Sequence, residues 1–203
     1  MTKHKDNKTE EQILEAAQKI FQAKGMDGAR MQEIADKASI NKAMLHYYYR
    51  SKQLLFEAVF KKSFALLAPQ LNAILNDDSS LEDKIKNFTH NYISFIIKHP
   101  YLPNFIIQEL NRNPEFIKKI KKNVAFPNIN KFKLQVQKEV NAGNIIPISA
   151  EQLFINILAL NIFPFVASPL IKAFTEVDDN DYKSLLEARK KEVSDFIINA
   201  IKK

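Results

Sequence analysis

Side chains that can donate hydrogen bonds are concentrated between residues 42 and 52, in the segment KAMLHYYYRSK. Ammonium, imidazole and phenol groups donate to phosphate oxygens, which accept half or more of the hydrogen bonds between proteins and DNA. Consecutive helical residues point in different directions, so these groups cannot all face inward. The alternative is that the three tyrosines form an aromatic core cluster. The candidate DNA-contacting residues are Arg30, Lys42, Ala43, Met44, His46, Tyr47, Tyr48 and Lys52.

The surrounding sequence predicts the elements that would position these groups. Residues 31–37 are typical of one short helix, residues 38–40 of a turn, and residues 42–48 of a second short helix. Leu45 is the predicted inward anchor of the second helix. Asn41 is its predicted N-cap, because an asparagine side chain can accept from the amides of the first turn. This arrangement is a helix-turn-helix, whose second helix lies in the major groove.

The start of the second helix is where base edges would be read. Lys42 is a candidate donor to guanine acceptors, whereas Ala43 and Met44 offer apolar contact to thymine methyl groups. Ser51 is a predicted N-cap of the next helix. The free amides in the first turn of that helix, together with Lys52, would form another phosphate site.

Two local signals predict where the first helix begins and ends. Thr9 and Gln12 have the spacing of a capping box, which predicts a helix start. Gly25 follows the apolar repeat and predicts its end.

The spaced pattern of these residues is specific. It consists of Thr9, Ile13, Leu14, Ala17, Phe21, Gly25, Ile34, Ala35, Ala38, Leu45, Tyr48, Tyr49, Ser51, Lys52, Leu54 and Leu55. Through these positions, residues 9–60 resemble the N-terminal DNA-binding domain of the tetracycline-repressor (TetR) family. The family usually has glycine in the turn where this chain has Ser39. A non-glycine residue at positive φ is uncommon, so the turn is expected to be either slightly strained or differently shaped. The family's usual tyrosine at a backbone-contacting position is replaced by His46.

Composition excludes several other kinds of site. The chain has 203 residues and no cysteine, which excludes thiolate catalysis and cysteine-ligated metals. Its three glycines, Gly25, Gly28 and Gly143, cannot form a dinucleotide fingerprint or a Walker phosphate loop. The four histidines lack paired metal-ligand spacing. We therefore expect no catalytic residue, no metal, no cofactor and no enzymatic activity.

The charge balance favours a polyanionic partner. The formal net charge is +7, and the residues through Lys62 contain 12 Lys and Arg against 8 Asp and Glu. This excess is modest, so it supports the motif without identifying double-stranded DNA by itself.

Long stretches of 3.6-residue periodicity predict an all-α fold. We expect a three-helix helix-turn-helix domain at residues 1–51 and a helical ligand-binding and dimerisation domain at residues 52–203. The segment 153–170 has the length of a membrane span, but its asparagines and prolines argue against one. A cytoplasmic protein without a membrane partner is therefore expected. The apolar helices near 150–167 and 182–201 would pair in a homodimer, or else be buried within one subunit.

The resemblance also implies a small-molecule pocket among the middle helices. An apolar cavity with a few polar groups is what such a site requires, although core packing is the alternative for each residue. The candidates are Phe64, Phe88, Tyr92, Phe105, Gln108, Phe126 and Phe163. The function implied is a dimeric transcriptional repressor released from its operator by a small apolar or aromatic effector. The alternative is an effector-independent architectural or division-related DNA-binding protein of the same fold.

Overall fold

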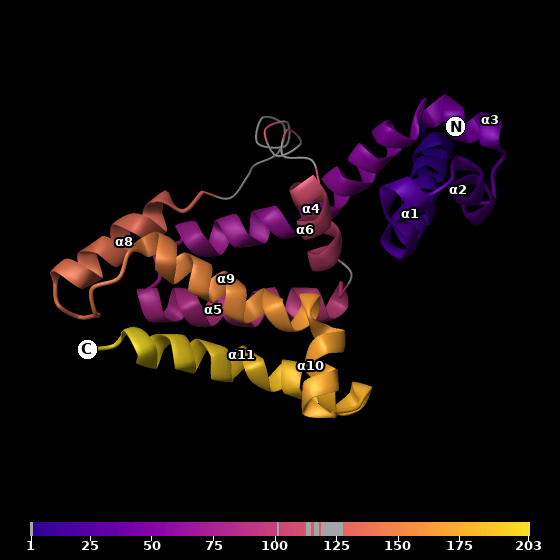
Figure 1. Cartoon of the computed structure of the whole chain (residues 1–203). Helices are drawn as coiled ribbons and strands as arrows, with labels where there is room; N and C mark the ends of the chain where they lie inside the picture. The colour runs from indigo at the N-terminus through magenta and orange to yellow at the C-terminus, as the bar shows by residue number, and fades with distance from the viewer. Residues whose placement is uncertain (1, 101, 113–114, 116–117, 119–127) are drawn as a thin grey trace. The chain divides into compact units, whose positions relative to one another are not determined.

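The computed structural model describes residues 2–100, 102–112, 115, 118 and 128–203, and over these residues the fold is all-α. The described residues form ten helices and no strand (Figure 1). The helices are α1 (Thr2–Gly28), α2 (Met31–Lys37), α3 (Lys42–Tyr48), α4 (Lys52–Asn76), α5 (Leu81–Lys98), α6 (Leu102–Arg112), α8 (Asn130–Asn141), α9 (Ala150–Val166), α10 (Ser168–Thr175) and α11 (Asp179–Ile201).

The chain divides into two compact units, residues 1–65 and 66–203, and the division falls within α4. The first half of α4 belongs with the N-terminal helices because its apolar residues, including Leu55, Phe56 and Phe60, are buried. The domain boundary between residues 51 and 52 remains a prediction, and it marks the start of α4.

The N-terminal unit packs α1 against α2 and the start of α4. Phe21 of α1 meets Phe56 of α4 edge to face, with ring centroids 5.0 Å apart. Gly25 has φ 67° and interrupts the helical geometry of α1, as predicted from its position after the apolar repeat. The helix begins at Thr2, upstream of the predicted start at Thr9.

The C-terminal unit is built around α5, which contacts both α9 and α11. Helix α11 runs along α5, and α9 packs on both (Figure 1). The core side chains come from these three helices and from α8; they include Ile85, Phe88, Ile93, Ile96, Phe132, Leu153, Ile157, Val193 and Ile197.

Serine caps begin two of these helices. The Ser80 hydroxyl accepts from the Asp83 amide at 3.1 Å, and the Ser149 hydroxyl accepts from the Gln152 amide at 3.2 Å. These bonds satisfy amides that have no partner within the helix.

No single helix in the described part of the chain has the length and apolarity needed to cross a membrane. One bent pair, α9 and α10 with 77° between them, passes the same test on length and composition alone.

Candidate nucleic-acid interface

A small cluster of buried apolar residues packs on the inward side of the helix-turn-helix. Ile34, Ala35 and Leu45 are fully buried, and Ala38 is nearly so. Because Ala35 adds only a methyl group, α2 and α3 can approach closely at this point. Burying Leu45 while its neighbours stay exposed fixes which face of α3 is turned outward.

The turn between the two helices uses a strained residue. Ser39 has φ 56°, in the left-handed region, so of the two alternatives for this turn the structure has the strained one. The turn is closed by the Ile40 amide, which donates to the Ala35 carbonyl at 3.0 Å. Asn41 then caps α3, because its Oδ1 accepts from the Met44 amide at 2.7 Å.

We expect Ser39→Gly to raise the free energy of unfolding of the N-terminal unit by about 0.5–1 kcal/mol. The left-handed conformation costs a non-glycine residue roughly 1–2 kcal/mol, which exceeds the entropy that glycine adds to the unfolded chain, about 0.5–1 kcal/mol. Urea titration followed by circular dichroism measures the change. The control, Ala38→Gly, alters a residue with φ −83° and should lower stability instead. A less stable Ser39→Gly protein would show that the turn is not strained.

The outward face of α3 presents the predicted contact groups to solvent. Lys42, Ala43, Met44, His46 and Tyr47 are all exposed, and Tyr47 is 80% exposed. The fold of the free protein does not require an exposed phenol, imidazole and ammonium group on one short helix. Their exposure is what a helix seated in a groove requires.

Two further predicted residues lie at the edges of this surface. Tyr48 is half-buried, and its ring packs against Tyr47 with centroids 5.5 Å apart. It therefore contributes to the support of Tyr47 as well as to the surface. Arg30 is exposed at the N-cap of α2.

Lys52 is placed differently from the other cations. Its Nζ donates to the carbonyls of Asp27 at 3.2 Å and Ala29 at 3.1 Å. Two of the three ammonium donors thus bind the last turn of α1 and the link from α1 to α2. Ser51 behaves as predicted, since its hydroxyl accepts from the Leu54 amide at 3.2 Å at the start of α4. Lys52 therefore has a clear structural role, and its contact with phosphate stays a prediction.

A side-chain hydrogen bond that was not predicted from the sequence attaches the end of α3 to α1. The Tyr49 hydroxyl donates to Oε1 of Glu10 on α1 at 2.9 Å. Burial, together with this bond and the charge of Glu10, raises the pKa of Tyr49, so the phenol remains a donor. Because α3 has only seven residues, its orientation depends on such attachments. The pairing joins residues 39 positions apart, and local sequence patterns carry no signal for it.

The predicted effector-site residues do not gather around one described cavity. Phe64, Phe88, Tyr92 and Phe105 are buried, and Phe88 stacks on Tyr92 with ring centroids 5.4 Å apart. Phe126 lies outside the described residues.

Phe163 and Gln108 are exposed in the single chain, so neither lies inside an enclosed cavity there. Phe163 lies on the outward side of α9. Its orientation could not be predicted, because α9 is apolar nearly all round and its periodicity does not identify the buried face. Asn161, two residues earlier, is the polar residue that is buried, and its Nδ2 donates to Thr89 Oγ1 at 3.3 Å.

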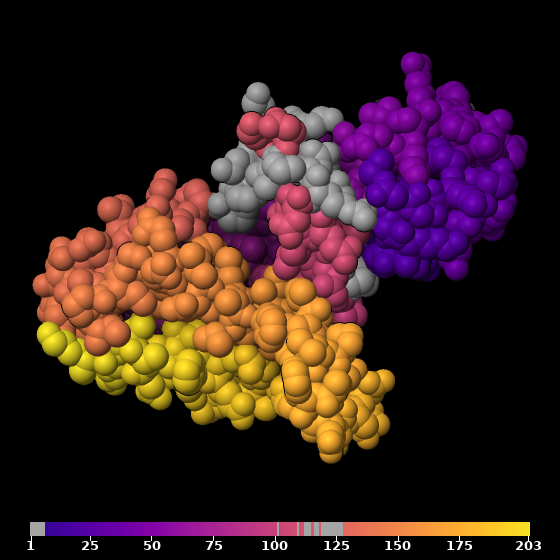
Figure 2. Space-filling model, in the orientation of Figure 1, coloured from indigo at the N-terminus to yellow at the C-terminus, as the bar shows by residue number. Residues whose placement is uncertain are grey.

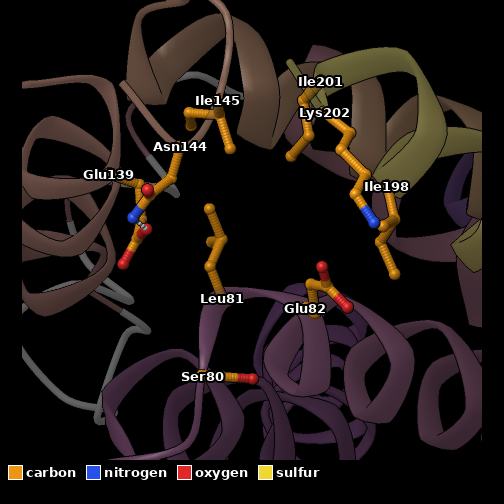
Figure 3. A pocket seen from close by; sticks show the side chains of 9 residues that line it. All are labelled: Ser80, Leu81, Glu82, Glu139, Asn144, Ile145, Ile198, Ile201 and Lys202. Atoms are coloured by element: carbon orange, nitrogen blue, oxygen red, sulfur yellow. Dashed lines mark hydrogen bonds between the residues drawn. The ribbon is translucent and has the colours of Figure 1, made fainter. Parts of the chain in front are cut away.

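The C-terminal unit has cavities lined by described residues, among them four of about 240–390 Å³, and the predicted aromatic set lines none of these four. One of about 310 Å³ lies between the start of α5, the link from α8 to α9, and the end of α11 (Figure 3). Its floor is apolar, with Leu81, Ile145 and Ile201, whereas Glu82 and Lys202 bring opposite charges to its rim. These mixed charges define no single class of ligand.

The described residues contain no group of three or more His, Cys, Asp or Glu side chains able to hold a metal ion.

Comparison with known proteins identifies the N-terminal unit. Residues 13–59 match the family described as bacterial regulatory proteins, tetR family. The chain is 21% identical over 160 residues to the probable HTH-type transcriptional regulator YttP of Bacillus subtilis, covering 78% of this chain and 77% of that protein. It is 29% identical over 105 residues to IcaR of Staphylococcus aureus, the HTH-type negative transcriptional regulator of the biofilm operon icaADBC, covering 52% of this chain and 55% of IcaR.

The fold extends over nearly the whole chain. The crystal structure of the transcriptional regulator FadR from Bacillus subtilis in complex with stearoyl-CoA matches with a TM-score of 0.67 and 16% identity. The match covers 94% of this chain and 98% of FadR. At this identity the likeness establishes the fold of both units and nothing finer.

Proposed function

Since this chain is a DNA-binding transcriptional regulator of the TetR family and not an enzyme, we propose that it acts as a two-fold dimer, each α3 reading one half-site of double-stranded DNA. The observation that carries this proposal is the outward face of α3. Lys42, His46 and Tyr47 are exposed there, while Leu45 is the buried residue of the helix. Such a short helix contacts few base pairs, and a second copy doubles the contact.

An exposed apolar surface on the C-terminal unit supports the dimer. The exposed large apolar side chains of α9, α10 and α11 are Ile155, Phe163, Leu170, Phe174, Leu185 and Phe196. We propose that they form one surface, which we call the apolar face. These three helices share the side of the unit seen in Figure 2. Large exposed apolar patches mark interaction sites. A second copy of the chain is the occupant that the two-fold reading of DNA calls for.

A groove between α9 and α11 adds to this surface. It has a volume of about 340 Å³ and is lined largely by apolar residues, among them Leu160, Phe196 and Ala200. Side chains of a partner helix could fill it, as knobs fill holes in helical bundles.

We further propose that the regulator is a repressor and that a small apolar effector releases it from DNA. IcaR is a negative regulator, and FadR was crystallised with an acyl-CoA. The effector must bind the released conformation more tightly than the DNA-bound one, because equal affinity would shift nothing. A chain that no small molecule releases from DNA would instead be the effector-independent alternative. We place the protein in the cytoplasm, with the DNA it binds.

The seating of α3 on phosphates is tested by Tyr47→Phe. We expect binding to weaken by roughly 0.5–1.5 kcal/mol per half-site, the usual worth of one hydrogen bond. The loss should be equal on all DNA sequences, because phosphates carry no sequence information. The salt dependence should stay unchanged, since no charge is removed, whereas loss of a lysine contact lowers the slope by about one. Gel-shift titrations at several salt concentrations measure both quantities.

A Tyr47→Phe protein that loses affinity for only one sequence would show that Tyr47 reads a base. Unchanged affinity on every sequence would remove Tyr47 from the interface and would count against the proposed orientation of α3.

A further inference from the structure

Helix α9 runs to Val166, but its backbone hydrogen bonding is broken once near the end, at Pro164, and α11 compensates for this break. Pro164 has no amide hydrogen, so the carbonyl of Leu160, four residues earlier, loses its helical donor. Arg189 of α11 supplies a replacement, because its Nη2 donates to the Leu160 carbonyl at 2.6 Å. The Tyr182 hydroxyl, also from α11, donates to the Pro164 carbonyl at 2.6 Å. Two side chains of one helix therefore hold the broken end of the other.

A cavity of about 390 Å³ lies beside this break, a volume within the usual range of small-molecule sites, about 300–1,000 Å³. The last turn of α5, helix α6, the junction of α9 with α10, and the first turns of α11 all contribute to it. Its apolar lining residues are Ile97, Pro100, Phe165, Pro169 and Leu186; its polar ones are Asn104, Ser168, Tyr182 and Lys183.

Lys183 is the one charged residue among the described residues that line this cavity. Lys183 is exposed at the edge and brings an ammonium group, whereas no carboxylate lines the cavity among the described residues. Asn104 and Ser168 are half-buried and add neutral hydrogen-bonding groups. Burial raises the pKa of Tyr182, partly opposed by a hydrogen bond with Ser168 and by the charges of Lys172 and Arg189, so its hydroxyl keeps its proton.

We propose that this cavity binds a small carboxylate with an apolar body, the carboxylate against Lys183 and the body against Phe165 and Leu186. A cationic ligand would meet Lys183 without any opposing charge on the described lining. A carboxylate gains that charge, while its apolar part covers the accessible apolar surface of Ile97, Pro100 and Pro169 at the same cavity. The site is separate from the aromatic set of the middle helices and supplies the effector site of the proposed function, on which its regulatory role rests.

The position of the cavity couples its occupant to the apolar face. Phe165 and Ser168 adjoin the break in α9, and Leu186 belongs to α11. Leu170 and Phe174 on α10, and Leu185 beside Leu186, are exposed members of the apolar face. An occupant therefore touches helices that would contact the second copy. If two arrangements of these helices differ in DNA affinity as well as in affinity for the occupant, the occupant lowers DNA affinity by the same factor by which DNA lowers the affinity for the occupant.

Binding is tested by calorimetry on the full chain with octanoate, octan-1-ol and octylamine, each below its aggregation concentration. We expect octanoate to bind most tightly, octan-1-ol more weakly and octylamine least. Lys183→Met should weaken octanoate binding about two- to fivefold, the range for a solvent-exposed charge pair, and leave octan-1-ol binding unchanged. Asn104→Trp, which fills the cavity, should weaken both ligands.

Lys202→Met is the matched control, because Lys202 lines the separate 310 Å³ cavity at the other end of α11. Octanoate binding that responds to Lys202→Met and not to Lys183→Met would overturn the proposal, as would equal binding of octanoate and octylamine. Melting temperatures of each variant check folding, and Lys183→Met changes only an exposed residue. Binding that follows the expected order but leaves operator affinity unchanged would keep the site and remove its role as the effector site.

Discussion

We expect Phe196→Glu to leave the chain monomeric and to weaken operator binding by about two orders of magnitude or more, because specific binding depends on two linked half-sites. Phe196 is 65% exposed in the single chain and lies in the apolar face. In the proposed dimer its ring would be buried against the second copy. A carboxylate at that place would have to lose its hydration without a partner, which is costly. Light scattering gives the oligomeric state, and gel-shift titration gives the affinity.

Leu134→Glu is the control for this prediction. Leu134 is 73% exposed on α8, outside the apolar face, so the same loss of an apolar group should leave the dimer intact. Ile197 is unsuitable because it is 3% exposed and belongs to the core, where a charge would unfold the unit. A Phe196→Glu protein that remains dimeric would place the dimer interface elsewhere.

The second large effect concerns the reading of bases. We expect Lys42→Ala to weaken binding to a symmetric operator by roughly 2–6 kcal/mol, since a lost base contact costs about 1–3 kcal/mol and occurs in both half-sites. Lys42 is exposed in the first turn of α3, the part of a recognition helix that contacts base edges. Binding to unrelated DNA should fall much less, so the specificity ratio should fall.

The control is Lys61→Ala, which removes the same charge from an exposed position on α4 of the N-terminal unit. A general electrostatic contribution would make both variants equally weak on all DNA. If Lys42→Ala loses no more specificity than Lys61→Ala, then Lys42 does not contact a base.

Local signals were sufficient to predict much of the DNA reader. The Asn41 cap and the Ser51 cap each depend on residues at most a few positions apart, whereas the sequence left open whether the turn at Ser39 is strained or differently shaped. Leu45 follows from helical spacing. By contrast, the start of α1 was predicted too late, because the polar residues before Thr9 contain no apolar repeat to mark a helix.

Contacts between distant residues could not be predicted in this way. The Lys52 ammonium binds carbonyls near the end of α1, and nothing in its own neighbourhood distinguishes it from a free phosphate-binding lysine. Tyr49 on Glu10 is a contact of the same kind.

The outward position of Phe163 and the pairing of Arg189 with Leu160 both depend on how α9 is rotated against α11. Helix α9 is apolar on every side, so its sequence does not determine that rotation.

The central claim, that two copies of α3 read two half-sites, is tested most directly by selecting binding sites from random DNA with the purified full chain. The result predicted is a two-fold symmetric site whose half-sites are centred about 34–36 Å apart, or a multiple of that spacing. The same selection with Lys42→Ala should lose preference at one position in each half. A single unrepeated element, or the same site for both proteins, would contradict the account.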